Sequence, residues 1–293
     1  MSAAQAKPRP VRRSFGFNKI FLILAIIYLL VPLVATLFFG LAGSGGIDFS
    51  TFQQIIGDPN FRQTLILSLE LAFSTTILAI VLVTPTAYWV HLRVPKARPL
   101  MDFLTLMPFA VPAIIMSLGL VELYGTNDTL TSVLSFGLVP VLSYDPFNII
   151  DTPQLLVCAY VILSLPFVYR PIDNSLRAIN TTTLTEAAYS LGSGWWRTFL
   201  TVVLPNIWPG IISAALLTFS TVMGEFTLAS LFGIFTFPIY LDEIGQENAR
   251  EAASLAILSF IFTLICVLAI IFLVRRSAGR IRDDSELEIV ATK

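Results

Sequence analysis

Six apolar stretches, each close to or above the length that crosses a bilayer, constrain this chain most strongly. They lie at residues 18–41, 63–90, 101–124, 154–170, 205–234 and 253–274. A helix needs about 20 mostly apolar residues to cross the hydrocarbon core, and helices satisfy their backbone hydrogen bonds internally. Charged residues make up 13% of the 293 residues, about half the share of a soluble domain. The sequence therefore predicts an all-α polytopic membrane protein with six transmembrane helices.

The lysines and arginines are sorted to one side of these predicted spans. All of the 18 except Arg62 and Arg250 fall in the two terminal tails or in the loops after the second and fourth spans. Because short basic loops stay in the cytoplasm, we predict that both termini are cytoplasmic. Two arginines precede the first span as in a signal peptide, but its apolar run is too long for one. We expect a cytoplasmic tail, one transmembrane domain and a second cytoplasmic tail, at 1–17, 18–276 and 277–293.

The predicted outer loops carry acidic residues. These are Asp48, Asp58, Asp128, Asp145, Asp151, Asp242, Glu243, Glu247 and Glu251. Two interpretations are open: ordinary solvated loop charge, or a docking face for an external partner with basic patches. Residues 130–142 in the second outer loop are apolar but too short to span, which predicts an interfacial or re-entrant segment.

The sequence lacks the residue patterns that a disulfide framework, a histidine-rich metal site or a phosphate-binding loop requires. Cys158 and Cys266 both lie in apolar runs, which argues against a disulfide framework. His91 is the only histidine, which argues against a histidine-rich metal site. No glycine precedes any lysine, so a phosphate-binding loop of the type G-x-x-x-x-G-K-[ST] is absent. We therefore expect that this chain is not an enzyme, carries no cofactor or metal, and has no nucleic-acid partner.

The cytoplasmic loop at 171–205 holds two successive amphipathic patterns separated by glycine. Thr183 and Glu186 have the spacing of a capping box, which predicts a helix start at Thr183. An apolar stripe at helical spacing follows, at Leu184, Ala187, Ala188 and Leu191. Gly192 and Gly194 then predict a left-handed stop. The pattern indicates a helix of about two turns with one apolar face.

A second apolar stripe begins at once in the same loop. It consists of Trp196, Phe199, Leu200 and Val203. A helix resting on lipid headgroups is one interpretation of the first pattern. Its apolar face is rich in alanine and poor in cations and aromatic rings, which favours a groove on another protein.

The loop matches a long signature of fixed spacing, EAA-x3-G-x9-I-x-LP. The matching positions are Glu186, Ala187, Ala188, Gly192, Val202, Leu204 and Pro205. Val202 in place of isoleucine is the one departure. This signature marks the membrane subunits of binding-protein-dependent ABC importers. With six spans, cytoplasmic termini and the motif between spans four and five, the whole chain resembles type I importer permeases of the maltose/methionine-permease class.

The resemblance implies that the short helix at 183–194 is a coupling helix, which inserts into a groove on a separate ATPase subunit. The contact residues implied are Glu186, Ala187, Ala188, Leu191 and Gly192. ATP and Mg²⁺ are then expected on the ATPase chain, in agreement with the missing phosphate-binding loop. The resemblance also implies an ATPase dimer, a second permease chain, identical or homologous, and an extracytoplasmic substrate-binding protein. The location it implies is the prokaryotic inner membrane, spanned several times and surrounded by lipid.

Glu225 lies about midway along the predicted fifth span, where a charge is costly and usually faces a cavity or another helix. Ser220, Thr221 and Gly224 beside it permit close helix approach. Two interpretations are open for Glu225. It contacts a cation or an ammonium group on the translocation pathway, or it is a protonated carboxyl group between helices that stabilises the subunit interface. Glu225, Ser220, Thr221 and Gly224 are the candidate pathway residues.

The triplet Gly224-Glu225-Phe226 resembles permeases for ferric iron, sulfate/molybdate, thiamine and phosphonates. The run MPFAVPAIIMSLGL in the third span resembles those and the spermidine/putrescine permeases. The resemblance implies the permease subunit of an ATP-driven importer for a small polar solute, such as a polyamine, a phosphonate, ferric iron or a related ion. The alternative is a stand-alone secondary transporter or channel, which needs its own driving-force machinery and discontinuous helices in matching halves.

Overall fold

The computed structural model describes residues 17–43, 46–47, 49–124 and 152–291 of the chain. Its first half contains α1 (Phe17–Leu41), β1 (Ala42–Gly43), β2 (Gly46–Ile47), α2 (Ser50–Gly57), α3 (Pro59–Arg93), a 3₁₀ turn (Pro95–Ala97), α4 (Arg98–Ala110) and α5 (Ala113–Tyr124). Its second half contains α7 (Pro153–Ala178), α8 (Thr181–Ser190), α9 (Trp195–Thr198), a π-helical turn (Phe199–Val203), α10 (Leu204–Asn206), α11 (Trp208–Met223), α12 (Thr227–Leu231), α13 (Phe237–Glu247) and α14 (Ala249–Ala291). The prediction of a predominantly helical chain is confirmed, and β1 and β2 form only a two-residue antiparallel ladder.

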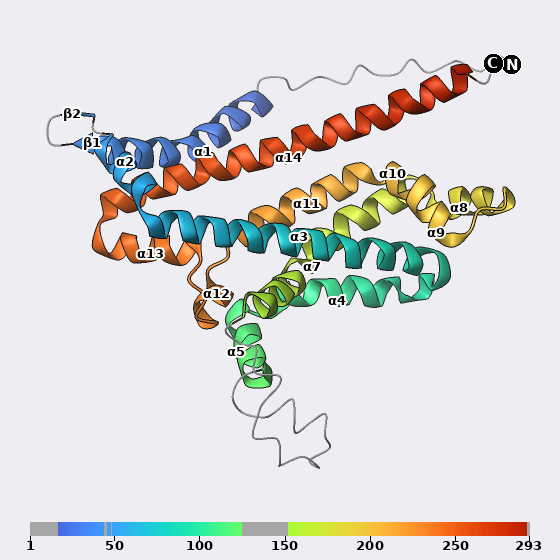
Figure 1. Ribbon diagram of the computed structural model, residues 1–293, viewed down its shortest axis with the longest axis horizontal. Coiled ribbons are helices and arrows are strands. Elements are labelled where there is room, and N and C mark those ends of the chain that lie inside the picture. The colour runs from blue at the N-terminus through green and yellow to red at the C-terminus, as the bar shows by residue number, and fades with distance from the viewer. Residues whose placement is uncertain (1–16, 44–45, 48, 125–151, 292–293) are drawn as a thin grey trace, which may run out of the picture.

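Three long helices, α3, α7 and α11, pack against one another and form the centre of the molecule. One apolar core lies at the end of this bundle near α8 and includes Tyr88, Tyr169 and Phe199. A second core lies toward the other end and includes Tyr160 and Phe219. The helices α1 and α14 lie side by side along one flank (Figure 1). The described apolar side chains of α1 are mostly exposed, which suits contact with lipid or with another membrane chain.

Four helical segments are long and apolar enough to cross a membrane, by length and composition. They are Ile20–Leu41, Pro59–Arg93, Pro153–Ala178 and Ala249–Phe272. Two bent helix pairs raise the number to as many as six if each pair counts as one span. These bent pairs replace the predicted third and fifth spans, which the sequence pattern presents as continuous apolar runs.

The predicted third span, 101–124, is not one helix. It breaks between α4 and α5, and the pair bends by 97° at this point, so that α5 turns away from α4 in Figure 1. Val111 adopts an extended conformation, with φ −98° and ψ 115°. The following Pro112 explains this, because its ring disfavours the helical region for the preceding residue and it has no amide hydrogen to donate.

The predicted fifth span, 205–234, is also broken. A bend of 74° separates the segment Trp195–Asn206 from α11. At 16 residues α11 is about 24 Å long, shorter than the hydrocarbon core of about 30 Å. It ends at Met223, and the chain continues through the short helix α12 rather than as a straight span.

The fourth span is longer than predicted. The pattern predicts 154–170, whereas α7 continues to Ala178, so the predicted loop start at residue 171 lies inside a helix. Pro166 and Pro171 both lie within α7. The predicted segment at 130–142 and the acidic residues Asp48, Asp128, Asp145 and Asp151 lie outside the described residues.

Candidate functional site

The short helix α8 follows α7 after only two residues and lies at one end of the bundle (Figure 1). The predicted capping box is wrong, because α8 begins at Thr181 and Thr183 is its third residue. The N-cap is Asn180, which has a left-handed backbone with φ 50° and makes no side-chain cap. The Thr181 hydroxyl instead donates to the Leu176 carbonyl of α7 at 2.5 Å. The start of α8 is therefore set by its attachment to α7, and Glu186 is free of a capping role.

The end of α8 confirms the predicted left-handed stop at Gly192, whereas Gly194 is extended, with φ −82° and ψ 169°. Gly192 has φ 81°, a conformation that glycine adopts without steric cost. Its amide donates to the Tyr189 carbonyl at 2.9 Å, and the Ser193 amide donates to the Ala188 carbonyl at 3.0 Å. These two bonds form a Schellman motif, which satisfies the last carbonyls of the helix.

The predicted apolar face of α8 is split by the tertiary structure. The buried positions are Thr181, Thr185 and Ala188, one helical side that faces the rest of the chain. Ala187 and Leu191 point away from it, and Leu191 is 89% exposed. The prediction of a single face made of Leu184, Ala187, Ala188 and Leu191 is therefore wrong.

The buried face of α8 is attached to α3 through an aromatic cluster. The Tyr88 hydroxyl shares a hydrogen bond of 3.1 Å with the Thr185 hydroxyl. The Tyr88 ring stacks on Phe199, with ring centroids 5.3 Å apart, and lies 5.4 Å from Trp195. A tyrosine places its apolar ring in a core while its hydroxyl finds a polar partner. Tyr88 thus joins α3 both to α8 and to the segment that follows it.

The second predicted stripe also divides between two environments. Phe199 and Val203 are buried, whereas Trp196 and Leu200 are exposed. A π-helical turn runs from Phe199 to Val203; such turns are rare and frequently lie at functional sites. Only half of the predicted stripe therefore packs on the protein.

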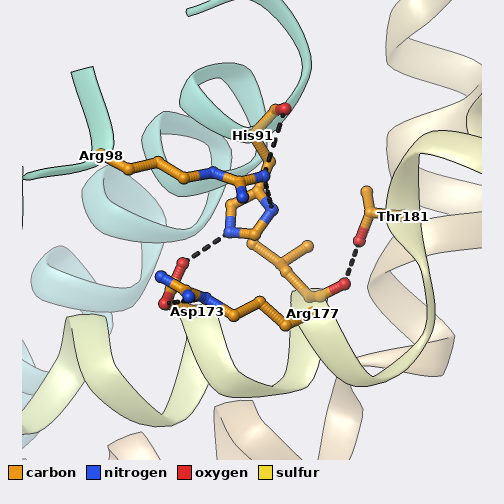
Figure 2. Close-up of polar contacts among 6 residues, drawn as sticks. His91, Arg98, Asp173, Arg177 and Thr181 are labelled. Carbon is orange, nitrogen blue, oxygen red and sulfur yellow. Dashed lines mark hydrogen bonds and ion pairs between the residues drawn. The ribbon is translucent and has the colours of Figure 1, made fainter. Parts of the chain in front are cut away.

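A polar cluster that the sequence does not predict lies beside this attachment (Figure 2). His91 Nε2 lies 2.5 Å from Asp173 Oδ1, and Arg98 Nη2 lies 2.8 Å from His91 Nδ1. Arg177 Nε donates to Asp173 Oδ2 at 2.8 Å. The described residues contain no group of three or more His, Cys, Asp or Glu that could hold a metal ion. The position of Asp173 between Arg170 and Arg177, four residues before the second, is the signal that could have singled it out.

The four candidate pathway residues do not share one surface. Glu225 lies just beyond the end of α11 rather than midway along a helix, and it is 9% exposed. Its carboxylate accepts from the Leu228 amide at 3.0 Å and from the Ala229 amide at 3.4 Å, at the first turn of α12. Ser220 and Gly224 are exposed. The Glu225 carboxylate therefore organises its own chain.

The half-buried Thr221 has a partner on its own helix. Its hydroxyl donates to the Leu217 carbonyl one turn earlier, at 2.8 Å. This bond is common for threonine in a helix and leaves no donor directed outward.

The acidic residues at the far end from α8 are partly engaged. Asp58 caps α3 by accepting from the Asn60 amide at 2.8 Å and also accepts from the Tyr240 hydroxyl at 2.5 Å. Burial, and then the neighbouring Asp58 carboxylate, raise the pKa of Tyr240 above its usual value. Glu243 and Glu247 on α13 are exposed. Only part of the predicted acidic face is thus available to a partner.

Two cavities flank α7. One of about 580 Å³ lies between α4, α7 and α11, and its polar side chains come from Arg170, Asn174, Ser175 and Ser213. The other, of about 510 Å³, lies between α3 and α7 and is lined by Glu70 and Gln154 among others. Both combine a charged group with a mostly apolar wall.

A bundle of long apolar helices with a short, partly exposed helix at one end is typical of a polytopic membrane protein. Residues 84–283 match the family described as "Binding-protein-dependent transport system inner membrane component". This chain belongs to that family, whose members are permease components of ABC importers.

Curated relatives include two bacterial permeases. The molybdenum transport system permease protein ModB of Azotobacter vinelandii is 35% identical over 170 residues, which cover 57% of this chain and 70% of that protein. The spermidine/putrescine transport system permease protein PotB of Escherichia coli K12 is 32% identical over 177 residues, which cover 60% of this chain and 62% of that protein. The matched stretch thus spans about two thirds of these relatives.

The fold is also similar to that of solved structures. A chain in the crystal structure of a bacterial ABC transporter involved in the import of the acidic polysaccharide alginate superposes with a TM-score of 0.66 and 16% identity, covering 91% of this chain and 95% of that one. A chain from the same kind of transporter, in complex with an alginate pentasaccharide-bound periplasmic protein, gives a TM-score of 0.67. At this identity the likeness concerns the fold alone.

Proposed function

We propose that this chain is the transmembrane permease subunit of an ATP-driven importer and that α8 is its coupling helix. The observation that carries this proposal is the division of α8 into two faces. Buried threonines attach one face to α3 and α7, while Glu186, Ala187 and Leu191 are exposed on the other. An exposed leucine beside small side chains suits insertion into a groove on another protein.

The partners follow from the same role. ATP and Mg²⁺ bind to a dimer of separate ATPase subunits below α8, and a second permease chain, identical or homologous, completes the pathway. A substrate-binding protein docks at the opposite end, where Glu243 and Glu247 are exposed. The chain crosses the prokaryotic inner membrane six times with both termini in the cytoplasm, and each bent helix pair counts as one span.

The attachments of α8 suggest how motion reaches the membrane. When ATP binding closes the ATPase dimer, α8 moves with the groove that holds it. The Thr185–Tyr88 bond passes this motion to α3, and the Thr181–Leu176 bond passes it to α7. Since α3, α7 and α11 pack as one bundle, the pathway between the two permease chains opens outward.

We propose a small polar solute as the cargo, such as a polyamine, a phosphonate, ferric iron or a related ion. Ser220, Thr221 and Gly224 lie along the pathway, and Glu225 acts there by holding α12 in place. Membership of the permease family favours this role over the stand-alone transporter or channel.

The test is a charge reversal on the exposed face. The substitution Glu186→Lys reverses the charge on the exposed face of α8 and should reduce co-purification of the ATPase and ATP-driven uptake at least tenfold. A tenfold loss of association corresponds to about 1.4 kcal/mol of binding free energy. Glu247→Lys is the matched control for co-purification of the ATPase, since Glu247 is also exposed but lies on α13 at the far end of the molecule (Figure 1). Undiminished association in the Glu186 variant contradicts the coupling role, and uptake that needs no ATPase supports the stand-alone transporter.

A further inference from the structure

The two ring nitrogens of His91 face partners of opposite character (Figure 2). A guanidinium group has only donors, so Arg98 Nη2, 2.8 Å from Nδ1, can only donate to it. Nδ1 therefore accepts and carries no proton. The single ring proton of a neutral imidazole then lies on Nε2, which donates to the Asp173 carboxylate at 2.5 Å. The contacts thus select one tautomer of His91.

We propose that His91 is a neutral hydrogen-bonding relay that positions the coupling helix α8. It links Arg98 at the start of α4 to Asp173 near the end of α7, and it lies itself in the last turn of α3. The positioning role rests on the proposed function of α8, whereas the relay itself is a property of the chain alone.

The cluster already carries one more positive than negative charge when the His91 ring is neutral. Asp173 already has the Arg177 guanidinium as an ion-pair partner at i+4, and Arg98 supplies a second positive charge on the far side of the ring. His91 and Asp173 are each 5% exposed. A proton on Nδ1 would set its N–H against the N–H of Arg98 Nη2 and add a third positive charge, which a buried site disfavours.

The His91–Asp173 hydrogen bond joins the ends of α3 and α7, the two helices to which α8 is attached by hydrogen bonds. Three residues before His91, Tyr88 bonds to Thr185. Three residues after Asp173, the Leu176 carbonyl accepts from Thr181. Sliding of α7 along α3 would therefore pull Thr181 and Thr185 in different directions. The His91–Asp173 bond prevents this movement, so α8 moves with both helices as one body.

Substitutions at His91 separate a neutral relay from an ion pair. Glutamine carries one donor and one acceptor on a neutral group, so His91→Gln can satisfy both Asp173 and Arg98. Lysine carries only donors, so His91→Lys can pair with Asp173 but opposes Arg98. Leucine satisfies neither partner. The relay predicts that glutamine substitutes for His91 and that lysine and leucine do not, whereas an imidazolium–carboxylate pair predicts the reverse order for glutamine and lysine.

The tautomer is directly measurable because His91 is the only histidine of the chain. The full chain, labelled with ¹⁵N in histidine ring nitrogens and placed in lipid nanodiscs, should give one protonated and one unprotonated ring signal at neutral pH. The protonated nitrogen should be Nε2. Two protonated nitrogens, or a proton on Nδ1, would overturn the relay.

The positioning role is measured by a distance within the chain. Spin labels are placed at the exposed Glu186 and Lys96 after replacement of Cys158 and Cys266 by serine. In nanodiscs, His91→Gln should retain the narrow distance distribution of the unsubstituted chain. His91→Leu and His91→Lys should broaden it about twofold, because α8 then opens locally.

General loss of stability is controlled by Phe219→Ala, which removes a fully buried ring from the core remote from α8. This variant should unfold more easily but keep the narrow distribution. A narrow distribution in His91→Lys, or broadening in His91→Gln and Phe219→Ala alike, would overturn the positioning role. No ATPase is present in this measurement, so its failure is distinguishable from failure of the Glu186→Lys test.

Discussion

Two short helices, α8 and α12, end in the same way but serve opposite purposes. Gly192 after α8 has φ 81° and Gly233 after α12 has φ 68°, and both positions carry the two backbone bonds of a Schellman motif. Leu191 at the end of α8 is exposed, whereas Leu228 and Ala229 of α12 are completely buried. The same local stop thus produces one surface for a partner and one element of the core.

The glutamates associated with the two helices show the same difference in exposure. Glu186 is exposed on α8, and Glu225 is buried, where it accepts the first free amides of α12. A glutamate close to an apolar pattern therefore does not indicate by itself whether it binds a partner or its own chain. Burial and the position of free amides decide between the two, and four experiments sharpen the comparison.

The largest effect is expected at Glu225. The substitution Glu225→Ala should lower the free energy of unfolding by about 2–3 kcal/mol, because buried amides of α12 lose a charged acceptor. Denaturation in mixed micelles monitored by circular dichroism measures this change. Glu247→Ala is the matched control and should be neutral within about 0.5 kcal/mol. Lost transport at unchanged stability would instead assign Glu225 to the pathway.

Substitutions at the two neighbouring alanines of α8 test which of its faces is buried. Ala188→Leu should destabilise the protein by about 1–3 kcal/mol, because Ala188 is buried against the bundle. Ala187→Leu should change stability by less than about 0.5 kcal/mol, because Ala187 is exposed. The measurements are unfolding in mixed micelles and co-purification of the ATPase, which Ala187→Leu should reduce. Equal destabilisation by both substitutions would show that the assignment of the two faces is wrong.

The two left-handed glycines test whether both stops have the same energetic basis. An added Cβ meets no atom within 4 Å at Gly192 or at Gly233. Replacement of either by alanine therefore costs only backbone strain, about 1–2 kcal/mol in each case. Thermal unfolding of the two variants measures these costs. A much larger loss at Gly233 would indicate that the buried helix α12 adds a packing cost of its own.

The smallest effect is expected for the bond that joins α8 to α3. Thr185→Val removes the partner of the Tyr88 hydroxyl and should cost about 0.5–1.5 kcal/mol. Thr182→Val is the control, since Thr182 is exposed on the same helix. Hydrogen exchange of the α8 amides measures the local opening, which should increase in Thr185→Val. Unchanged exchange would mean that the Thr181–Leu176 bond and the aromatic stack hold α8 without the Thr185 hydroxyl.

Local patterns predicted a substantial part of the candidate site. The spacing of Gly192 in the motif predicted the stop of α8, because a left-handed residue after a helix depends mainly on its own backbone. The predicted start at Thr183 was wrong, because a bond from Thr181 to α7 moves the helix start by two residues. His91 and Asp173 lie 82 positions apart, and no local pattern relates them.

The sequence by itself determined the class of this protein. Long apolar runs, sorted basic residues and the fixed spacing from Glu186 to Pro205 are one-dimensional features, since bilayer thickness and loop charge act on each segment separately. Only the tertiary structure decided where the fifth span breaks and which face of α8 is free. It also decided which groups meet His91. These depend on contacts between helices distant in the chain, because burial and hydrogen-bond partners are properties of the packed bundle.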